Sequence, residues 1–218
     1  MMAADRERLE RDGCLLVSGA AAGPALTRLA DRLGSVKAGA RVSTRDPALE
    51  EVLSALTGIV EPVQPRARAV RALWFDKTPE ANWLVPWHQD RTIAVRERRD
   101  APGFGPWSVK QGTCHVEPPF ALLAAMLTVR LHIDDCPVEN APLEVANGSH
   151  RERVAAEAAA SAAERYPRQL CLAEAGDLWI YRTPILHRSA RAAAPRRRRV
   201  LQVDFCAQQL FAGLLWAD

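Results

Sequence analysis

The sequence predicts a mainly β protein with flanking helices, an α+β fold built around a helix-flanked β-sandwich or barrel. Three observations carry this prediction. The chain has 218 residues, of which 48% are hydrophobic, which suits one globular domain with a sizeable core. Its first 69 residues show helical spacing of apolar side chains, whereas residues 70–210 break into short strand-like runs separated by Pro- and Gly-rich turns. We therefore expect a single domain over residues 1–218, with a helical layer (1–69) on a β core (about 70–210).

The N-terminal part contains two amphipathic helical segments that lack candidate catalytic groups. Residues Pro24–Leu33 place Leu26, Leu29, Ala30 and Leu33 at helical spacing. A further helix is expected from Pro47, with Gly58 as its stop signal. A short charged helix (5–12) and a strand (14–17) precede them. These segments are expected to pack on one face of a sheet.

The β core is expected to hold five strand-like segments and one long loop. The loop, Ala101–Pro119, is rich in Gly and Pro, and its Phe104 and Trp107 suggest a lid or a substrate wall. An Ala-rich helix is expected over Arg153–Arg165. The strands are expected at 70–77, 85–95, 122–134, 178–181 and 200–206, and residues 184–190 carry His187.

Composition excludes several classes of function. The net charge is only +3, and the Arg-rich stretch near residue 198 is a local cluster without the aromatic platform of a nucleic-acid-binding module. No run of ~18 apolar residues predicts a membrane span. The five cysteines form no CxxC pair, which disfavours a zinc site and a disulfide framework and fits a reducing compartment. We expect a cytoplasmic protein, monomeric or dimeric, that acts on a small molecule.

His88-Gln89-Asp90 is the candidate centre of the chemistry. On a strand, His88 and Asp90 point to one side. A second imidazole, for which His187 is the candidate, would complete the 2-His-1-carboxylate triad of non-haem Fe(II) oxygenases. His-x-Asp is weak by itself, because a lone His or Asp is more often structural, and the chain has a second copy in His132-Ile133-Asp134. Spacing alone leaves the choice between the two copies open.

The ordered set of motifs resembles the phytanoyl-CoA dioxygenase family of Fe(II)/2-oxoglutarate oxygenases, in particular its short bacterial members. The matching residues are Trp87-His88-Gln89-Asp90, Asp134-Asp135 with Asn140-x-Pro142-Leu143, Gly148-Ser149-His150, Gly176-Asp177, His187-x-Ser189, and Arg198 eleven residues after His187.

The resemblance implies a double-stranded β-helix (jelly-roll, cupin-like) and selects His88, Asp90 and His187 as ligands of Fe(II). It also implies that 2-oxoglutarate meets Arg198 and Ser189, with O2 as the oxidant. Arg196–Arg199 is a continuous run, so the residues next to Arg198 are alternatives for the clamp. Arg198 is the first choice, and Arg197 and Arg199 are expected on the other strand face. Further pocket candidates are Lys77, Trp87, Trp107, Arg130 and His132, of which Lys77, Arg130 and His132 would recognise an anion.

Two residues depart from the family pattern. Ala141 stands where the family usually has the Gly of an Asn-Gly turn, and Asn147 stands where a Pro precedes Gly-Ser-His. The expected function is a dioxygenase that hydroxylates or otherwise oxidises a small molecule with release of succinate and CO2. The alternatives are a non-oxidative cupin-like metal-binding protein and a non-catalytic binding homologue.

Overall fold

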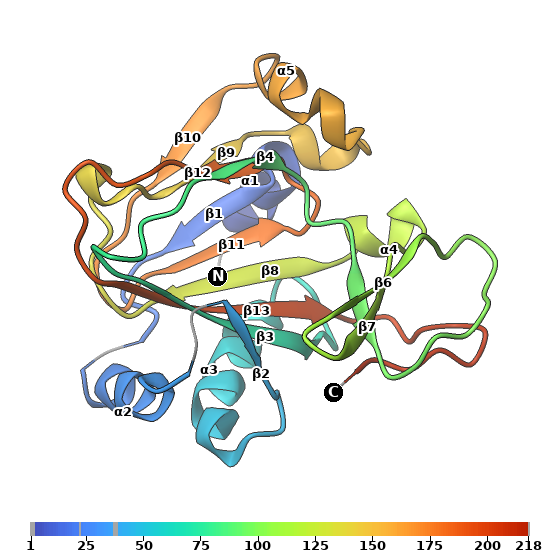
Figure 1. Cartoon of the computed structure of the whole chain (residues 1–218), viewed down its shortest axis with the longest axis horizontal. Coiled ribbons are helices and arrows are strands. Elements are labelled where there is room, and N and C mark those ends of the chain that lie inside the picture. Colours follow the sequence, from blue (N-terminus) through green and yellow to red (C-terminus); the bar gives the residue numbers. More distant parts are fainter. Residues whose placement is uncertain (1–2, 22, 37–38, 218) are drawn as a thin grey trace.

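Two antiparallel sheets lie face to face at the centre of the computed structural model, which describes residues 3–21, 23–36 and 39–217 (Figure 1). The larger sheet has the strand order β1-β11-β8-β13-β3-β2, and the smaller sheet has the order β10-β9-β12-β4. From β8 to β13 the chain passes repeatedly between the two sheets, which makes the core a double-stranded β-helix. The larger sheet consists of β1 (Cys14–Val17), β2 (Ala40–Val42), β3 (Arg68–Lys77), β8 (Leu127–His132), β11 (Leu178–Arg182) and β13 (Arg198–Cys206), and the smaller one of β4 (Val85–His88), β9 (Leu143–Ala146), β10 (Arg168–Cys171) and β12 (His187–Ser189).

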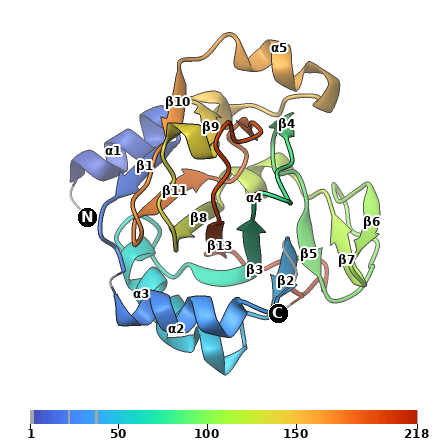
Figure 2. The same ribbon diagram turned by 60° about the vertical axis from the view of Figure 1, so that its left-hand side comes forward.

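Helices from the N-terminal part cover the outer face of the larger sheet. They are α2 (Pro24–Leu33) and α3 (Glu50–Val60), the latter preceded by a 3-10 turn, η1 (Pro47–Leu49), whereas α1 (Ala3–Asp12) packs beside the edge strand β1. Figure 2 shows α2 and α3 lying against this sheet on the side away from α5. The apolar stripe of α2 is buried in the main core together with the outward side chains of β8 and β13. The expected helix stop at Gly58 was wrong: α3 continues to Val60, whose full burial outweighs the low helix propensity of glycine.

Strict alternation along β13 separates the core from the interior between the sheets. Leu201, Val203 and Phe205 point outward into the helical core, whereas Arg198, Gln202 and Asp204 are buried on the inner face. The same period of two runs along β3 and β8. This alternation places a row of polar side chains between the two sheets.

The segment expected to be a loop lid is instead part of a third small sheet. Strands β6 (Trp107–Lys110) and β7 (Thr113–Val116) form a hairpin that pairs with β5 (Ile93–Val95). Phe104 and Trp107 pack against the buried cluster beneath this sheet. A row of β-branched and aromatic residues on both sides of the Gln111-Gly112 turn is a hairpin signal, which the surrounding Gly and Pro residues concealed.

Three other expected elements have different limits. The strand expected over 122–134 begins with a short helix, α4 (Phe120–Ala124), so that β8 starts only at Leu127. The helix expected over 153–165 is reduced to η4 (Ala156–Ala158) and α5 (Ala159–Ala163), because Arg153 and Val154 bond to other segments. The strand expected over 85–95 is interrupted after His88. The remaining short elements are the 3-10 turns η2 (Val138–Asn140) and η3 (Ser149–Arg151).

Within the described ranges, no helix combines the length and the apolar character needed to cross a bilayer.

Candidate metal centre and cosubstrate pocket

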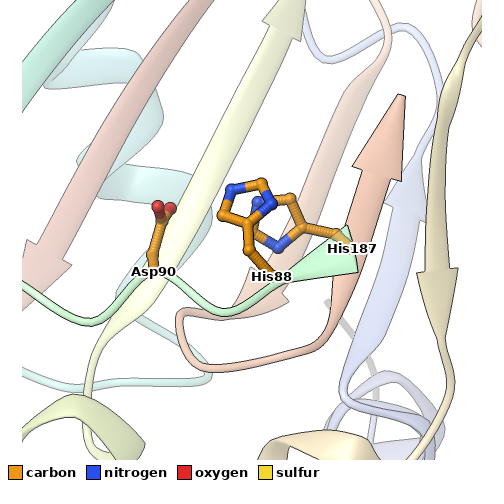
Figure 3. Close-up of side chains that lie close together, drawn as sticks. All are labelled: His88, Asp90 and His187. Atoms are coloured by element: carbon orange, nitrogen blue, oxygen red, sulfur yellow. The ribbon is translucent and has the colours of Figure 1, made fainter. Parts of the chain in front are cut away.

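His88, Asp90 and His187 lie together between the two sheets (Figure 3). One donor atom from each side chain lies within 4.8 Å of the others. The pairing of β12 with β4 places His187 directly opposite His88, and the centroids of the two rings are 4.2 Å apart. Asp90 follows the end of β4. These three side chains form the only such cluster of His, Cys, Asp and Glu donors among the residues that the structure describes.

Each imidazole is held in one tautomer by its own backbone. Nδ1 of His88 lies 2.8 Å from the carbonyl oxygen of Pro86, and Nδ1 of His187 lies 2.9 Å from that of Ile185. A carbonyl only accepts, so Nδ1 carries the proton in both rings and Nε2 keeps its lone pair. Burial, followed by the neighbouring His88, lowers the pKa of His187 to about 4, which keeps this imidazole neutral near pH 7. Two imidazoles that present Nε2, together with a carboxylate, fit the ligand preferences of Fe(II).

Asp90 is supported by a buried guanidinium–carboxylate pair. Nη2 of Arg71 lies 4.0 Å from Asp90, and its Nε donates to Asp204 at 2.5 Å. Asp204 in turn accepts from Thr128 at 2.9 Å. Burial opposes the ionisation of Asp90, but His187 and Arg71 outweigh it and lower the pKa of this carboxyl group. Asp90 is therefore a carboxylate at neutral pH, as a metal ligand must be.

A cavity of about 150 Å³ joins the triad to Arg198 and Ser189. Arg198 is buried, and its Nη1 donates to the carbonyl oxygens of Asn140 and Ala141, while Nη2 lies 3.4 Å from Oγ of Ser189. Arg197 and Arg199 face the other way and pair with Asp76 and Asp134. Among the described residues, Arg198 has no carboxylate partner, so this end of the cavity presents an uncompensated positive charge.

Besides Arg198 and the paired Arg71, two more cations line the same cavity. Nζ of Lys77 lies 3.4 Å from Oγ of Ser189 and donates to the carbonyl of Trp83 at 2.8 Å. Burial, then Arg198 and Arg130, lowers the pKa of Lys77 to about 8. Arg130 lies on the cavity wall nearer the triad, with Nη1 donating to Gln202 at 2.5 Å.

Three of the expected pocket residues lie elsewhere. Trp87 is on the opposite side of β4 from His88 and carries Arg188 over its ring at 5.0 Å. Trp107 belongs to the β5–β7–β6 sheet. His132 is buried on the inner face of β8 but does not line the cavity. In the second His-x-Asp copy, Asp134 is engaged by Arg199, and neither His132 nor Asp134 belongs to a donor cluster of the described residues.

Sequence reasoning missed three residues of the site. Arg71, Gln202 and Asp204 all lie on the inner faces of β3 and β13. They share these faces with Lys77 and Arg198 at even spacing, so polar residues at every second position of an otherwise apolar strand were the available signal.

Comparison with known proteins agrees with this geometry. The profile of the family described as "Phytanoyl-CoA dioxygenase (PhyH)" matches residues 9–200. No match was found among curated protein sequences.

Solved structures share the fold at low sequence identity. The epimerase SnoN from nogalamycin biosynthesis, in complex with Fe3+, alpha ketoglutarate and nogalamycin RO, superposes with a TM-score of 0.68 at 16% identity, over 92% of this chain and 81% of that one. HygX from Streptomyces hygroscopicus, with nickel and 2-oxoglutarate bound, gives 0.67 at 13% identity, over 94% and 86%. AviO1 from Streptomyces viridochromogenes Tue57 gives 0.63 at 19% identity, over 94% of both chains.

The family profile spans most of the chain, and the His-Asp-His cluster occupies the interior of the double-stranded β-helix. The chain belongs to the phytanoyl-CoA dioxygenase family and is a non-haem Fe(II)/2-oxoglutarate-dependent enzyme.

Proposed function

We propose that the enzyme couples the oxidative decarboxylation of 2-oxoglutarate to the hydroxylation, or a related oxidation, of a small-molecule substrate. The observation that carries the proposal is one cavity with a metal-binding triad at one end and an unpaired buried guanidinium, Arg198, at the other. A dicarboxylate cosubstrate fits these two ends.

In this proposal His88, Asp90 and His187 hold Fe(II). Bound iron, with 2-oxoglutarate and O2, supplies the oxidising chemistry, and succinate and CO2 are the co-products. The chain contributes position: the carbonyls of Pro86 and Ile185 fix both imidazoles with Nε2 unprotonated, and Arg71, which also pairs with Asp204, helps to keep Asp90 ionised.

Arg198 and Ser189 are proposed to bind the distal carboxylate of 2-oxoglutarate. The guanidinium is already oriented by the carbonyls of Asn140 and Ala141, so little side-chain freedom is lost on binding. Lys77 adds a second cation beside the same hydroxyl group.

A non-oxidative cupin-like metal protein, or a binding protein without catalysis, would not need Arg198. A buried guanidinium without a counter-charge is costly in free energy, and the cosubstrate provides the missing carboxylate. The architecture alone does not determine the product, since SnoN is described as an epimerase and SnoK as a carbocyclase. The fold supports the wider class of Fe(II)/2-oxoglutarate-dependent oxidations, and within this class hydroxylation is the outcome that we propose.

The test is succinate release by the purified protein with Fe(II), ascorbate, O2 and 2-oxoglutarate. We expect His88→Ala to abolish both Fe(II) binding and succinate release. His132→Ala is the matched control, because His132 is buried nearby without belonging to the triad, and it should retain metal binding. The opposite pattern would show that the metal site has been assigned to the wrong His-x-Asp copy.

A further inference from the structure

Arg130 is a buried cation that forms no ion pair with any described carboxylate, and Asp90 acts on it only at longer range. Arg130 is only 9% exposed, and its Nε is buried without a hydrogen-bond partner among the described residues. Among the residues that the structure describes, Arg130 forms no ion pair, whereas the neighbouring Arg71 is paired with Asp204. Its contacts include the amide oxygen of Gln202 and the ring of Phe75, whose centroid lies 5.2 Å from the guanidinium carbon, and it also lies beside the hydroxyl group of Tyr181.

The strand register places Arg130 apart from Arg198 along the cavity. Arg130 is paired with Gln202, and Arg198 lies four residues before Gln202 on the same inner face of β13. Arg130 and Gln202 therefore form the wall next to the triad, while Arg198 and Ser189 form the distal end. Besides Arg71, which is paired with Asp204, the cavity thus has two separate guanidinium groups that form no ion pair with a described carboxylate.

A single neutral partner does not explain why a guanidinium is kept in this position. Leaving an ionised group buried without a counter-charge costs several kcal/mol in general, and buried charges are usually paired or bind ligands. Gln202 satisfies one N–H group and fixes the orientation of the planar fork, which leaves Nε and the remaining donors for an anion.

We propose that Arg130, oriented by Gln202, is a second carboxylate-binding site that holds the carboxylate next to the keto group of the 2-oxo acid. The inference rests on the proposed function, because it assumes that 2-oxoglutarate occupies this cavity. It adds that the protein itself, and not the metal alone, recognises the keto-acid end. A carboxylate of the primary substrate is the other possible source of the anion, and the experiment separates the two.

The experiment is calorimetric titration of the Ni(II)-loaded protein with three ligands. 2-Oxoglutarate has both recognition groups, 2-oxopentanoate keeps the keto-acid end and lacks the distal carboxylate, and glutarate has two carboxylates without the keto group. Arg130→Met and Arg198→Met are compared with Arg199→Met as the control. Arg199 lies next to Arg198 on β13, faces away from the cavity and pairs with Asp134.

We expect Arg130→Met to weaken 2-oxoglutarate and 2-oxopentanoate by more than about tenfold each, the effect of removing one partner of a buried charge-assisted pair. Arg198→Met should weaken 2-oxoglutarate and glutarate and leave 2-oxopentanoate unchanged. Arg199→Met should leave all three unchanged. Arg130→Lys should restore part of the lost affinity, since it keeps the charge without the planar fork.

A second readout separates ligand recognition from a structural role. Because Arg130 is uncompensated in the ligand-free protein, Arg130→Met should raise or preserve the Tm without ligand and reduce the rise in Tm caused by 2-oxoglutarate. A lower Tm together with unchanged ligand affinities would overturn the inference and assign Arg130 to the structure. Unchanged affinity for both keto acids would also overturn it and leave the primary substrate as the source of the anion. If the wild-type Ni(II) protein failed to bind 2-oxoglutarate, the proposed function itself would fail.

Discussion

The four consecutive arginines from Arg196 to Arg199 show how strand geometry gives identical side chains different environments. Arg198 is buried in the cavity, whereas Arg197 and Arg199 form ion pairs with Asp76 and Asp134 on the outside. The resemblance to the family, in which an Arg follows the second metal-binding His at this spacing, made Arg198 the first choice for the inward position. The sequence could not predict Arg71 or Gln202 as neighbours of Arg198, because their roles depend on which strands become adjacent.

At this scale we predict that Arg198→Ala raises the Kd for 2-oxoglutarate by more than about tenfold, because a buried guanidinium–carboxylate contact is lost. Arg197→Ala and Arg199→Ala should leave the Kd within about twofold. Titration of the metal-loaded variants with 2-oxoglutarate measures this difference. Equal losses for all three would indicate a diffuse positive surface in place of a specific clamp.

Ala141 adopts a backbone conformation that disfavours side chains other than glycine. Its φ and ψ of 50° and 66° lie in the left-handed region, at an energetic cost of about 1 kcal/mol for a residue with a Cβ. Its carbonyl accepts from both Arg198 and Ser189, so the turn also shapes the distal end of the cavity.

We therefore predict that Ala141→Gly raises the free energy of unfolding by about 0.5 kcal/mol, since the relief of strain exceeds the entropy that glycine gains in the unfolded chain. Gly148→Ala, the converse substitution at a residue whose φ is 89°, should lower the free energy of unfolding by about 1 kcal/mol. Urea unfolding of both variants tests the pair. A loss of stability in Ala141→Gly would show that the methyl group packs more favourably than the backbone is strained.

Among the elements, β4 depends on the residue between the two expected ligands. Gln89 donates to the carbonyls of Glu152 and Pro184 and accepts from the backbone N–H of Val154. It thereby ties the end of β4 to the segment before α5 and to the turn before β12, which carries His187. This contact lies on the opposite side from the triad, as the alternation His-Gln-Asp implies.

We predict that Gln89→Leu lowers the free energy of unfolding by about 3 kcal/mol, because it leaves buried backbone groups without partners. It should also weaken metal binding, since His88 and His187 lose a common support. Gln208→Leu, at an exposed position, is the control and should change stability by less than about 0.5 kcal/mol. Denaturant unfolding and metal titration of both variants measure the two effects. Unchanged metal affinity in Gln89→Leu would mean that the strand pairing alone positions the ligands.

Secondary structure was predicted correctly where a single strand or helix periodicity continued along the segment, and wrongly where a helical pattern ran into a strand pattern. The run of residues 200–206 lies within β13 and alternates over its middle, residues 201–205, and Pro24–Leu33 keeps helical spacing and is α2. The apolar residues Leu122 and Leu123 extend the pattern of β8 backwards in the sequence, yet they belong to α4, because Pro119 starts a helical turn there. The β6–β7 hairpin was hidden in the same way by the Gly and Pro residues around it.

The whole molecule keeps buried imidazoles neutral, which makes its stability depend on pH. Among the described residues, neither ring nitrogen of His132 has a hydrogen-bond partner, and burial, followed by Arg130 and Arg198, lowers the pKa of His132 to about 3. For a group whose folded pKa lies below its unfolded value near 6.5, the unfolded chain binds the proton more readily between those two pH values. Stability is therefore complete above pH 6.5 and falls as the pH decreases toward 3.

For the metal-free protein we predict that His132 alone removes about 2 kcal/mol of stability between pH 6.5 and pH 5, at roughly 1.4 kcal/mol per pH unit. His187, with a pKa of about 4, adds to the loss in the same direction. His132→Leu isolates the first contribution: it should be at least as stable as the wild type at pH 7, because two unpaired buried nitrogens are removed, and its unfolding free energy should fall by about 2 kcal/mol less on moving to pH 5. Urea unfolding of both proteins in the presence of a chelator at the two pH values gives the comparison. Parallel losses in the two proteins would show that His132 is hydrated or paired in solution, and the polar interior of the β-helix would then be more open to water than its burial indicates.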